Sequence, residues 1–172
     1  MSEFGHKLQL DQIRDGDRVD IVADETERSA IAGRLGLQSL DRLEAHAVLS
    51  RDGSRIKVSG RLRASLEQSC VATGEPVSAH VDEPFNLAFV PEPRCASGDE
   101  EIELEEADLD TVFHDGSAID LGGAIADTLA LAIDPYPRSA GADAALKEAG
   151  VMSEEEASPF AALAALKEKL GK

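Results

Sequence analysis

The sequence has 172 residues, of which 42% are hydrophobic and 3% aromatic, and its 34 acidic and 17 basic side chains give a formal net charge of −17. This length suits one medium-sized domain, and the apolar content is enough for a core. No apolar run approaches the roughly 18 residues of a membrane span, and the N-terminus lacks the charged-then-apolar order of a secretory signal. We therefore expect a cytoplasmic protein with no membrane partner, in which Cys70 and Cys95 are reduced thiols.

The first third of the chain predicts two short strands followed by a helix. Polar and apolar residues alternate in 7–10 and in 18–22, on either side of an Asp-Gly turn. Asp24 and Glu27 have the spacing of a capping box, in which each side chain accepts a hydrogen bond from the backbone N–H of the other residue. The helix that begins there is expected to end at Gly36.

Regular alternation in 43–49 and 55–66, around the turn R-D-G-S, predicts a β-hairpin. Side chains point alternately to opposite faces of a strand, so one face of 55–66 is apolar and the other is basic. Gly60 falls on the apolar face, which indicates a bulge or close backbone packing. The basic face carries Arg55, Lys57, Arg61 and Arg63.

These four cations are the candidate RNA-binding residues. They extend over about 26 Å at about 3.3 Å per residue, a length that could follow several phosphates of a nucleic acid. The strand has no aromatic side chain on which a base could stack, so any contact would favour the backbone or shape of an RNA over its sequence. The alternative is a solvated outer face whose charges pair with the acidic part of the chain.

The segment C-V-A-T-G-E-P-V at 70–77 predicts a turn that leads into a strand at 77–90. A zinc site usually contains a C-x2-C or H-x3-H pair, but Thr73 stands where the partner of Cys70 would be, and the 4 histidines are far apart. We therefore expect neither a metal nor another cofactor. The turn is expected to be structural, with Gly74 supplying backbone freedom, and its residues are Cys70, Thr73, Gly74 and Pro76.

The chain after this strand is acidic and then helical. It has no Lys or Arg between Arg94 and Arg138, and acids concentrate between Asp99 and Asp110. Asp120 is positioned to cap a helix that Asp134-Pro135 would end.

The C-terminal part is expected to contain a linker and one amphipathic helix. Residues 139–157 are rich in Ala, Gly, Glu and Ser, which predicts a mobile linker with a transient helix at A-A-L-K-E-A. Ser158 and Pro159 favour a helix start, and the apolar side of the helix that follows carries the candidate partner-binding residues Phe160, Leu163 and Leu166.

Strands outnumber helices and most are joined by short turns, which predicts an α+β fold. We expect a twisted antiparallel β-sheet, open or curled into a barrel-like shape, with two covering helices. The expected organisation is a core domain at 1–138 and a flexible C-terminal extension at 139–172 that ends in a short helix. The sequence has no P-loop, nucleophile elbow, dinucleotide fingerprint or H-E-x-x-H motif, so we expect no enzyme. A metal-dependent hydrolase that uses carboxylates is an alternative.

Three separated stretches resemble, in order and spacing, the YceD family of large ribosomal RNA subunit accumulation proteins. They are residues 70–77 with the following F-N-L-A-F-V-P, residues 119–138, and residues 158–167. Many members of that family carry C-x2-C where this chain has Cys70 and Thr73. The resemblance implies a factor that supports accumulation of large-subunit ribosomal RNA, with no catalytic residues to carry over.

Together with the basic strand face, this resemblance leads to two hypotheses. The first is a non-enzymatic ribosome-biogenesis factor that contacts large-subunit ribosomal RNA or its precursor through the four cations, while the acidic region limits indiscriminate RNA binding. The second is an adaptor that binds ribosomal proteins or assembly factors, with Asp99–Asp110 meeting a basic protein and the C-terminal helix entering a groove.

Overall fold

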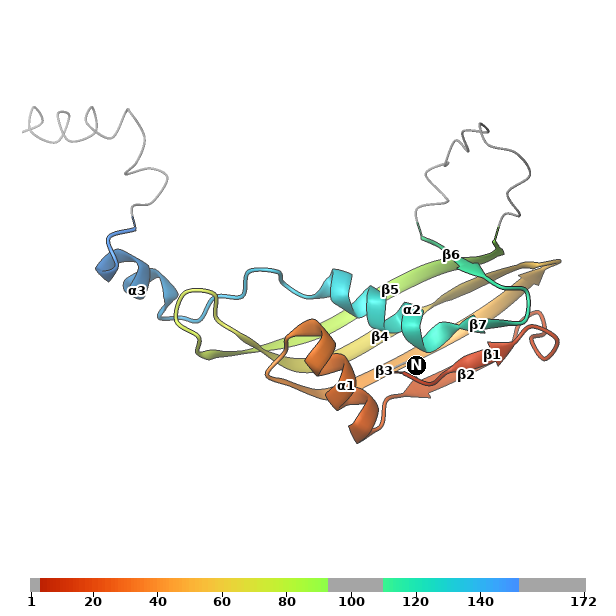
Figure 1. Cartoon of the computed structure of the whole chain (residues 1–172), viewed down its shortest axis with the longest axis horizontal. Helices are drawn as coiled ribbons and strands as arrows, with labels where there is room; N and C mark the ends of the chain where they lie inside the picture. Colours follow the sequence, from red (N-terminus) through yellow and green to blue (C-terminus); the bar gives the residue numbers. More distant parts are fainter. Residues whose placement is uncertain (1–3, 93–109, 152–172) are drawn as a thin grey trace, which may run out of the picture. The chain divides into compact units, whose positions relative to one another are not determined.

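The computed structural model describes residues 4–92 and 110–151 (Figure 1). By its contacts the chain divides into two compact units. The first, here called the sheet unit, comprises Met1–Gln68 and Ser78–Pro135. The second, here called the turn unit, comprises Ser69–Val77 and Tyr136–Lys172.

The sheet unit contains a five-stranded sheet in the order β2-β3-β4-β5-β6 and a two-stranded sheet of β1 and β7. The strands of the larger sheet are β2 (Arg18–Val22), β3 (Ser39–Asp52), β4 (Arg55–Ser69), β5 (Pro76–Pro91) and β6 (Thr111–His114). The smaller sheet pairs β1 (Lys7–Gln9) antiparallel with β7 (Ala118–Asp120). The predicted hairpin is confirmed, because β3 and β4 pair antiparallel from Ser39↔Glu67 to Asp52↔Arg55.

The α+β class is confirmed, and the sheet is open rather than closed into a barrel. It is also mixed and not purely antiparallel, because β5 and β6 pair in parallel. A parallel pair needs a connection of about a dozen residues or more, and residues 92–110 supply that length. The two short N-terminal strands do not form a hairpin with each other, since β1 pairs with β7 and β2 pairs with β3.

Both predicted helices form where their caps indicate. The helix α1 (Glu25–Leu35) has the complete capping box, with the Asp24 carboxylate accepting from the Glu27 N–H and the Glu27 carboxylate accepting from the Asp24 N–H. It ends at Gly36, whose φ of 66° lies in the left-handed region that favours glycine. The helix α2 (Leu121–Ala132) begins at Asp120, which accepts from the Gly123 N–H.

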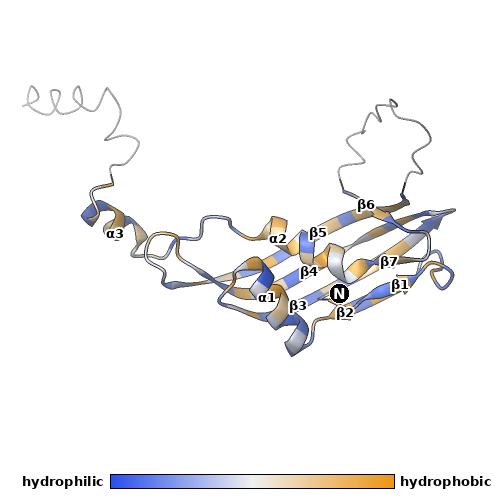
Figure 2. Cartoon of the chain, viewed as in Figure 1, coloured by the Kyte–Doolittle hydropathy of each residue, from blue (hydrophilic) through white to orange (hydrophobic). Residues whose placement is uncertain are grey.

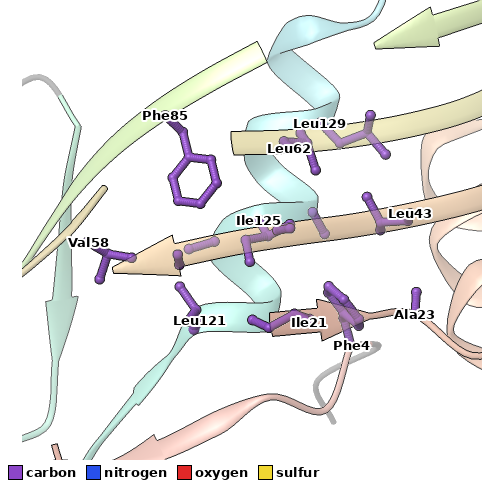
Figure 3. Close-up of a cluster of buried hydrophobic side chains, with 14 of the residues drawn as sticks. Phe4, Ile21, Ala23, Leu43, Val58, Leu62, Phe85, Leu121, Ile125 and Leu129 are labelled. Atoms are coloured by element: carbon purple, nitrogen blue, oxygen red, sulfur yellow. The ribbon is translucent and has the colours of Figure 1, made fainter. Parts of the chain in front are cut away.

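The core lies between one face of the larger sheet and the helices. Leu121, Ile125 and Leu129 of α2 are fully buried and face Leu43 and Leu62 on the sheet (Figure 3). Colouring by hydropathy shows polar and apolar residues alternating along the strands (Figure 2). The buried residues belong to the face that packs on α2, and the opposite face of the sheet is here called the outer face.

The turn unit contains the helix α3 (Ala142–Glu148), which forms within the stretch predicted as a mobile linker. The predicted C-terminal helix, with Phe160, Leu163 and Leu166, lies outside the described residues. So does the acidic stretch before Asp110. Within 4–92 and 110–151, no helix is long and apolar enough to cross a membrane.

Candidate functional site

The outer face of β4 presents the four cations predicted from the sequence. Lys57, Arg61 and Arg63 are exposed and Arg55 is partly buried. The apolar side chains between them point to the opposite face, into the core, where Ile56 and others are fully buried. The alternation follows from the pleat, because successive side chains leave a strand on opposite sides.

Acidic and polar residues of β3 lie beside these cations. The register places Glu44 opposite Arg63, and it places His46 opposite Arg61. Glu44 accepts hydrogen bonds from Arg42 at 2.7 Å, so its charge is already paired within β3. The outer face is therefore basic along β4 but not uniformly basic across the sheet.

The carboxylate of Asp82 on β5 lies at one end of the basic row, beside Arg61 and Arg63. Arg61 Nε donates to Asp82 Oδ1, and Arg63 Nε lies 3.5 Å from the same oxygen. The hydrogen bond from Arg61 lowers the pKa of Asp82, and the hydrogen bond to Asp82 raises the pKa of Arg61. About half of each side chain is exposed (50–52%), so solvent and salt screen the attraction, and another anion can compete for the guanidinium groups.

Sequence reasoning missed Asp82, although the parity of β5 contains the signal. Val77, Ala79 and Val81 alternate with polar residues, and this alternation places Asp82 among the polar positions. The charges of β4 thus pair in part, but with Asp82 of β5 and not with the acidic part of the chain that the alternative interpretation named. Among the described residues, the partner comes from the neighbouring strand.

A hollow of about 370 Å³ opens at the other end of the basic row, within the sheet unit, and is here called the basic hollow. Two of the predicted cations line it together with small, amide and acidic residues. Its lining residues are Arg55, Lys57, Ser59, Asn86, Leu87, Ala88 and Asp110. The structure thus divides the predicted cations into two pairs: Arg61 and Arg63 around Asp82, and Arg55 and Lys57 at the basic hollow.

The turn at 70–77 is held by polar contacts inside the turn unit. The Ser139 N–H donates to Cys70 Sγ at 3.3 Å, and the Ser139 hydroxyl donates to Glu75 at 2.8 Å. Thr73 Oγ1 lies 3.2 Å from the Ser139 hydroxyl oxygen. Gly74 has a φ of 74°, so the backbone freedom expected of it is used. In the described part of the chain, no three His, Cys, Asp or Glu residues are grouped closely enough to hold a metal ion.

We expect the Cys70 thiol to titrate at about pH 6 in the folded protein. Hydrogen bonds to the sulfur, above all from the Ser139 N–H, lower its pKa to about 6 because they stabilise the thiolate. A lowered folded-state pKa means that this contribution to stability is complete above the pKa of an unfolded thiol, about 8.5. The contribution is lost as the pH falls toward 6.

Thiolate absorbance followed against pH, in a Cys95→Ala background, measures this titration. In the Cys70→Ser control the titration should disappear, together with the part of the stability that depends on pH over the same range. A midpoint near 8.5 in the folded protein would show that the hydrogen bonds do not stabilise the thiolate.

Comparison with protein-family models matches residues 58–167 to the model described as large ribosomal RNA subunit accumulation protein YceD. The match covers most of the chain, including Arg61, Arg63 and the turn at 70–77, and it begins just after Lys57. No curated protein and no solved structure matches the chain.

Proposed function

The chain belongs to the YceD family, and on this premise we propose that it is a non-enzymatic factor that supports the accumulation of large-subunit ribosomal RNA. It contacts precursor RNA through the outer face of β4. The family description gives the role in RNA accumulation. The proposed contact surface consists of Arg55, Lys57, Arg61 and Arg63. We place this activity in the cytoplasm.

The observation that carries the proposal is one row of cations on one exposed strand. From Arg55 to Arg63 the row is about 26 Å long at about 3.3 Å per residue, and the spacing between its cations allows contact with successive phosphates. At physiological salt the Debye length is about 8 Å, so a local basic row attracts phosphate even though the whole chain carries a charge of −17.

Asp82 is an anion that a phosphate of the RNA can replace beside Arg61 and Arg63. In the free protein it holds Arg61 and Arg63 close to one point, which limits the rotamer freedom that these long side chains lose on binding. A phosphate offers the guanidinium groups an alternative anion with several acceptor oxygens. We infer that RNA binding replaces the Asp82 contacts with phosphate contacts and that recognition is directed at the RNA backbone.

We expect the double variant Arg61→Glu/Arg63→Glu to bind single-stranded RNA at least about 30-fold more weakly than the wild-type protein. The estimate assigns about 1 kcal/mol to each exposed guanidinium–phosphate contact. Fluorescence anisotropy with a labelled oligoribonucleotide of mixed sequence, repeated over a range of salt concentrations, measures the effect. Since both side chains are about half exposed (52% and 50%), the circular dichroism spectrum should not change.

Asp82→Asn is the matched control for this pair. It removes the competing carboxylate and leaves both guanidinium groups in place, so it should tighten RNA binding and make the log–log salt slope steeper by about 0.7. Unchanged RNA binding in both variants would remove the outer face from consideration. The adaptor hypothesis would then remain, and deleting residues 153–172 would test it by loss of protein partners.

A further inference from the structure

We propose that the basic hollow holds one ribose-phosphate unit of a bound RNA strand and that the Asp110 carboxylate accepts a hydrogen bond from its 2′-hydroxyl group. The inference rests on the proposed function, which it extends from RNA binding in general to discrimination between RNA and DNA. It assigns separate tasks to the two ends of the basic row: Arg61 and Arg63 contribute affinity, and the basic hollow contributes recognition of the sugar.

The lining of the basic hollow suits a phosphate joined to a sugar. Arg55 and Lys57 supply two positive charges, which attract a phosphate, and Ser59 and Asn86 supply neutral polar groups. Ala88 is small and only 8% exposed, so it leaves space between the longer side chains. The volume of about 370 Å³ is near the lower end of the roughly 300–1,000 Å³ found for ligand pockets, which suits a single nucleotide unit.

Asp110 is the feature that points to ribose. A carboxylate repels a phosphate bound in the same hollow, so Asp110 suits a ligand that carries a hydrogen-bond donor beside its phosphate better than it suits phosphate alone. An ionised carboxylate only accepts hydrogen bonds, so the sugar group it can bind is a hydroxyl. The 2′-hydroxyl is the group that distinguishes RNA from DNA at a given site.

The fold fixes the backbone of Asp110 at the edge of the basic hollow. The Ala88 N–H donates to the Asp110 carbonyl at 3.0 Å. The next residue, Thr111, is in register with Ala88 in the parallel pair of β5 and β6. The position of Asp110 beside Arg55 and Lys57 therefore follows from the unusual parallel strand rather than from nearness in the sequence.

The experiment compares wild-type protein and Asp110→Ala on three labelled oligonucleotides of the same sequence: RNA, DNA and 2′-fluoro RNA. The 2′-fluoro group cannot donate a hydrogen bond. Wild-type protein should bind RNA about tenfold more tightly than the other two, the value of one hydrogen bond to a charged group. Asp110→Ala should bind all three alike, with affinity for DNA unchanged or higher because a negative charge is removed.

Asp52→Ala is the matched control, because Asp52 lies opposite Arg55 on β3 but does not line the basic hollow. Removal of its charge should tighten binding of RNA and DNA equally and preserve the preference for RNA. If wild-type protein binds RNA and 2′-fluoro RNA equally, or if Asp110→Ala keeps the preference, the inference is overturned and the proposed function stands. Failure of the Arg61→Glu/Arg63→Glu variant to weaken RNA binding would instead overturn the proposed function.

Discussion

Replacing Gly60 by alanine should lower the free energy of unfolding by about 3 kcal/mol. A Cβ atom built at this position lies 2.2 Å from the His46 carbonyl oxygen and 2.7 Å from Phe85 Cζ. Neither neighbour can move easily, because His46 belongs to the paired strand β3 and Phe85 is buried in the core, with only 5% of the residue exposed. Real Cβ atoms do not approach other heavy atoms this closely, so the strands must separate locally or the ring must leave its position.

Urea unfolding followed by circular dichroism measures this loss, and Gly33→Ala is the matched control. Gly33 lies in α1 with nothing within 4 Å of a Cβ built there. The same substitution at Gly33 should stabilise the protein by up to about 1 kcal/mol, because alanine favours the helix over glycine. Equal stability of the Gly60→Ala variant and the wild-type protein would contradict the close packing of Phe85 on β4.

Gly122→Ala should destabilise the sheet unit by about 2–3 kcal/mol. Its Cβ would lie 2.2 Å from the Phe4 carbonyl oxygen and 3.1 Å from the His6 backbone nitrogen. The close approach is useful, because the His6 carbonyl accepts from the Leu121 and Gly122 N–H groups, which the first turn of a helix leaves without intrahelical partners. If residues 4–6 moved away to make room for the Cβ, the N–H groups of Leu121 and Gly122 would lose their acceptor. Phe4, which is only 1% exposed, would also be drawn out of the core.

Hydrogen exchange localises this second effect. The amides of β1 and of the first turn of α2 should exchange faster in Gly122→Ala, in addition to a lower midpoint of unfolding. Gly123→Ala is the control, since the nearest atoms to its Cβ would belong to the Asp120 side chain, the first at 2.9 Å, and not to backbone. The Asp120 side chain can shift where backbone cannot, at the cost of weakening its cap on α2 by about 1 kcal/mol. The loss should therefore be smaller than in Gly122→Ala, and similar losses in the two variants would refute the explanation.

Features that depend on short stretches of sequence could be predicted from the sequence. The capping box of Asp24 and Glu27, the cap at Asp120 and the β3–β4 hairpin all follow from local spacing, and the structure confirms them. The division of 55–66 into a basic and an apolar face follows from the same period-two alternation.

Features that depend on pairing between distant residues could not be predicted. The strands β6 and β7 have 4 and 3 residues, too few for a periodic pattern, and only their partners β5 and β1 define them. The same holds for the candidate site, because Asp82 and Asp110 join the basic row through strand pairing. Sequence alone identified the cations and could not show which anions accompany them.

The carboxylate of Asp82 also bears on how long a complex would last under the proposed function. When a phosphate leaves Arg61 and Arg63, the Asp82 carboxylate is close enough to pair with them again. The two guanidinium groups therefore need not be fully rehydrated before the RNA is released. Such an arrangement favours rapid turnover over permanent attachment. A protein that binds an RNA during assembly and must then dissociate from it would benefit from a short residence time on that RNA.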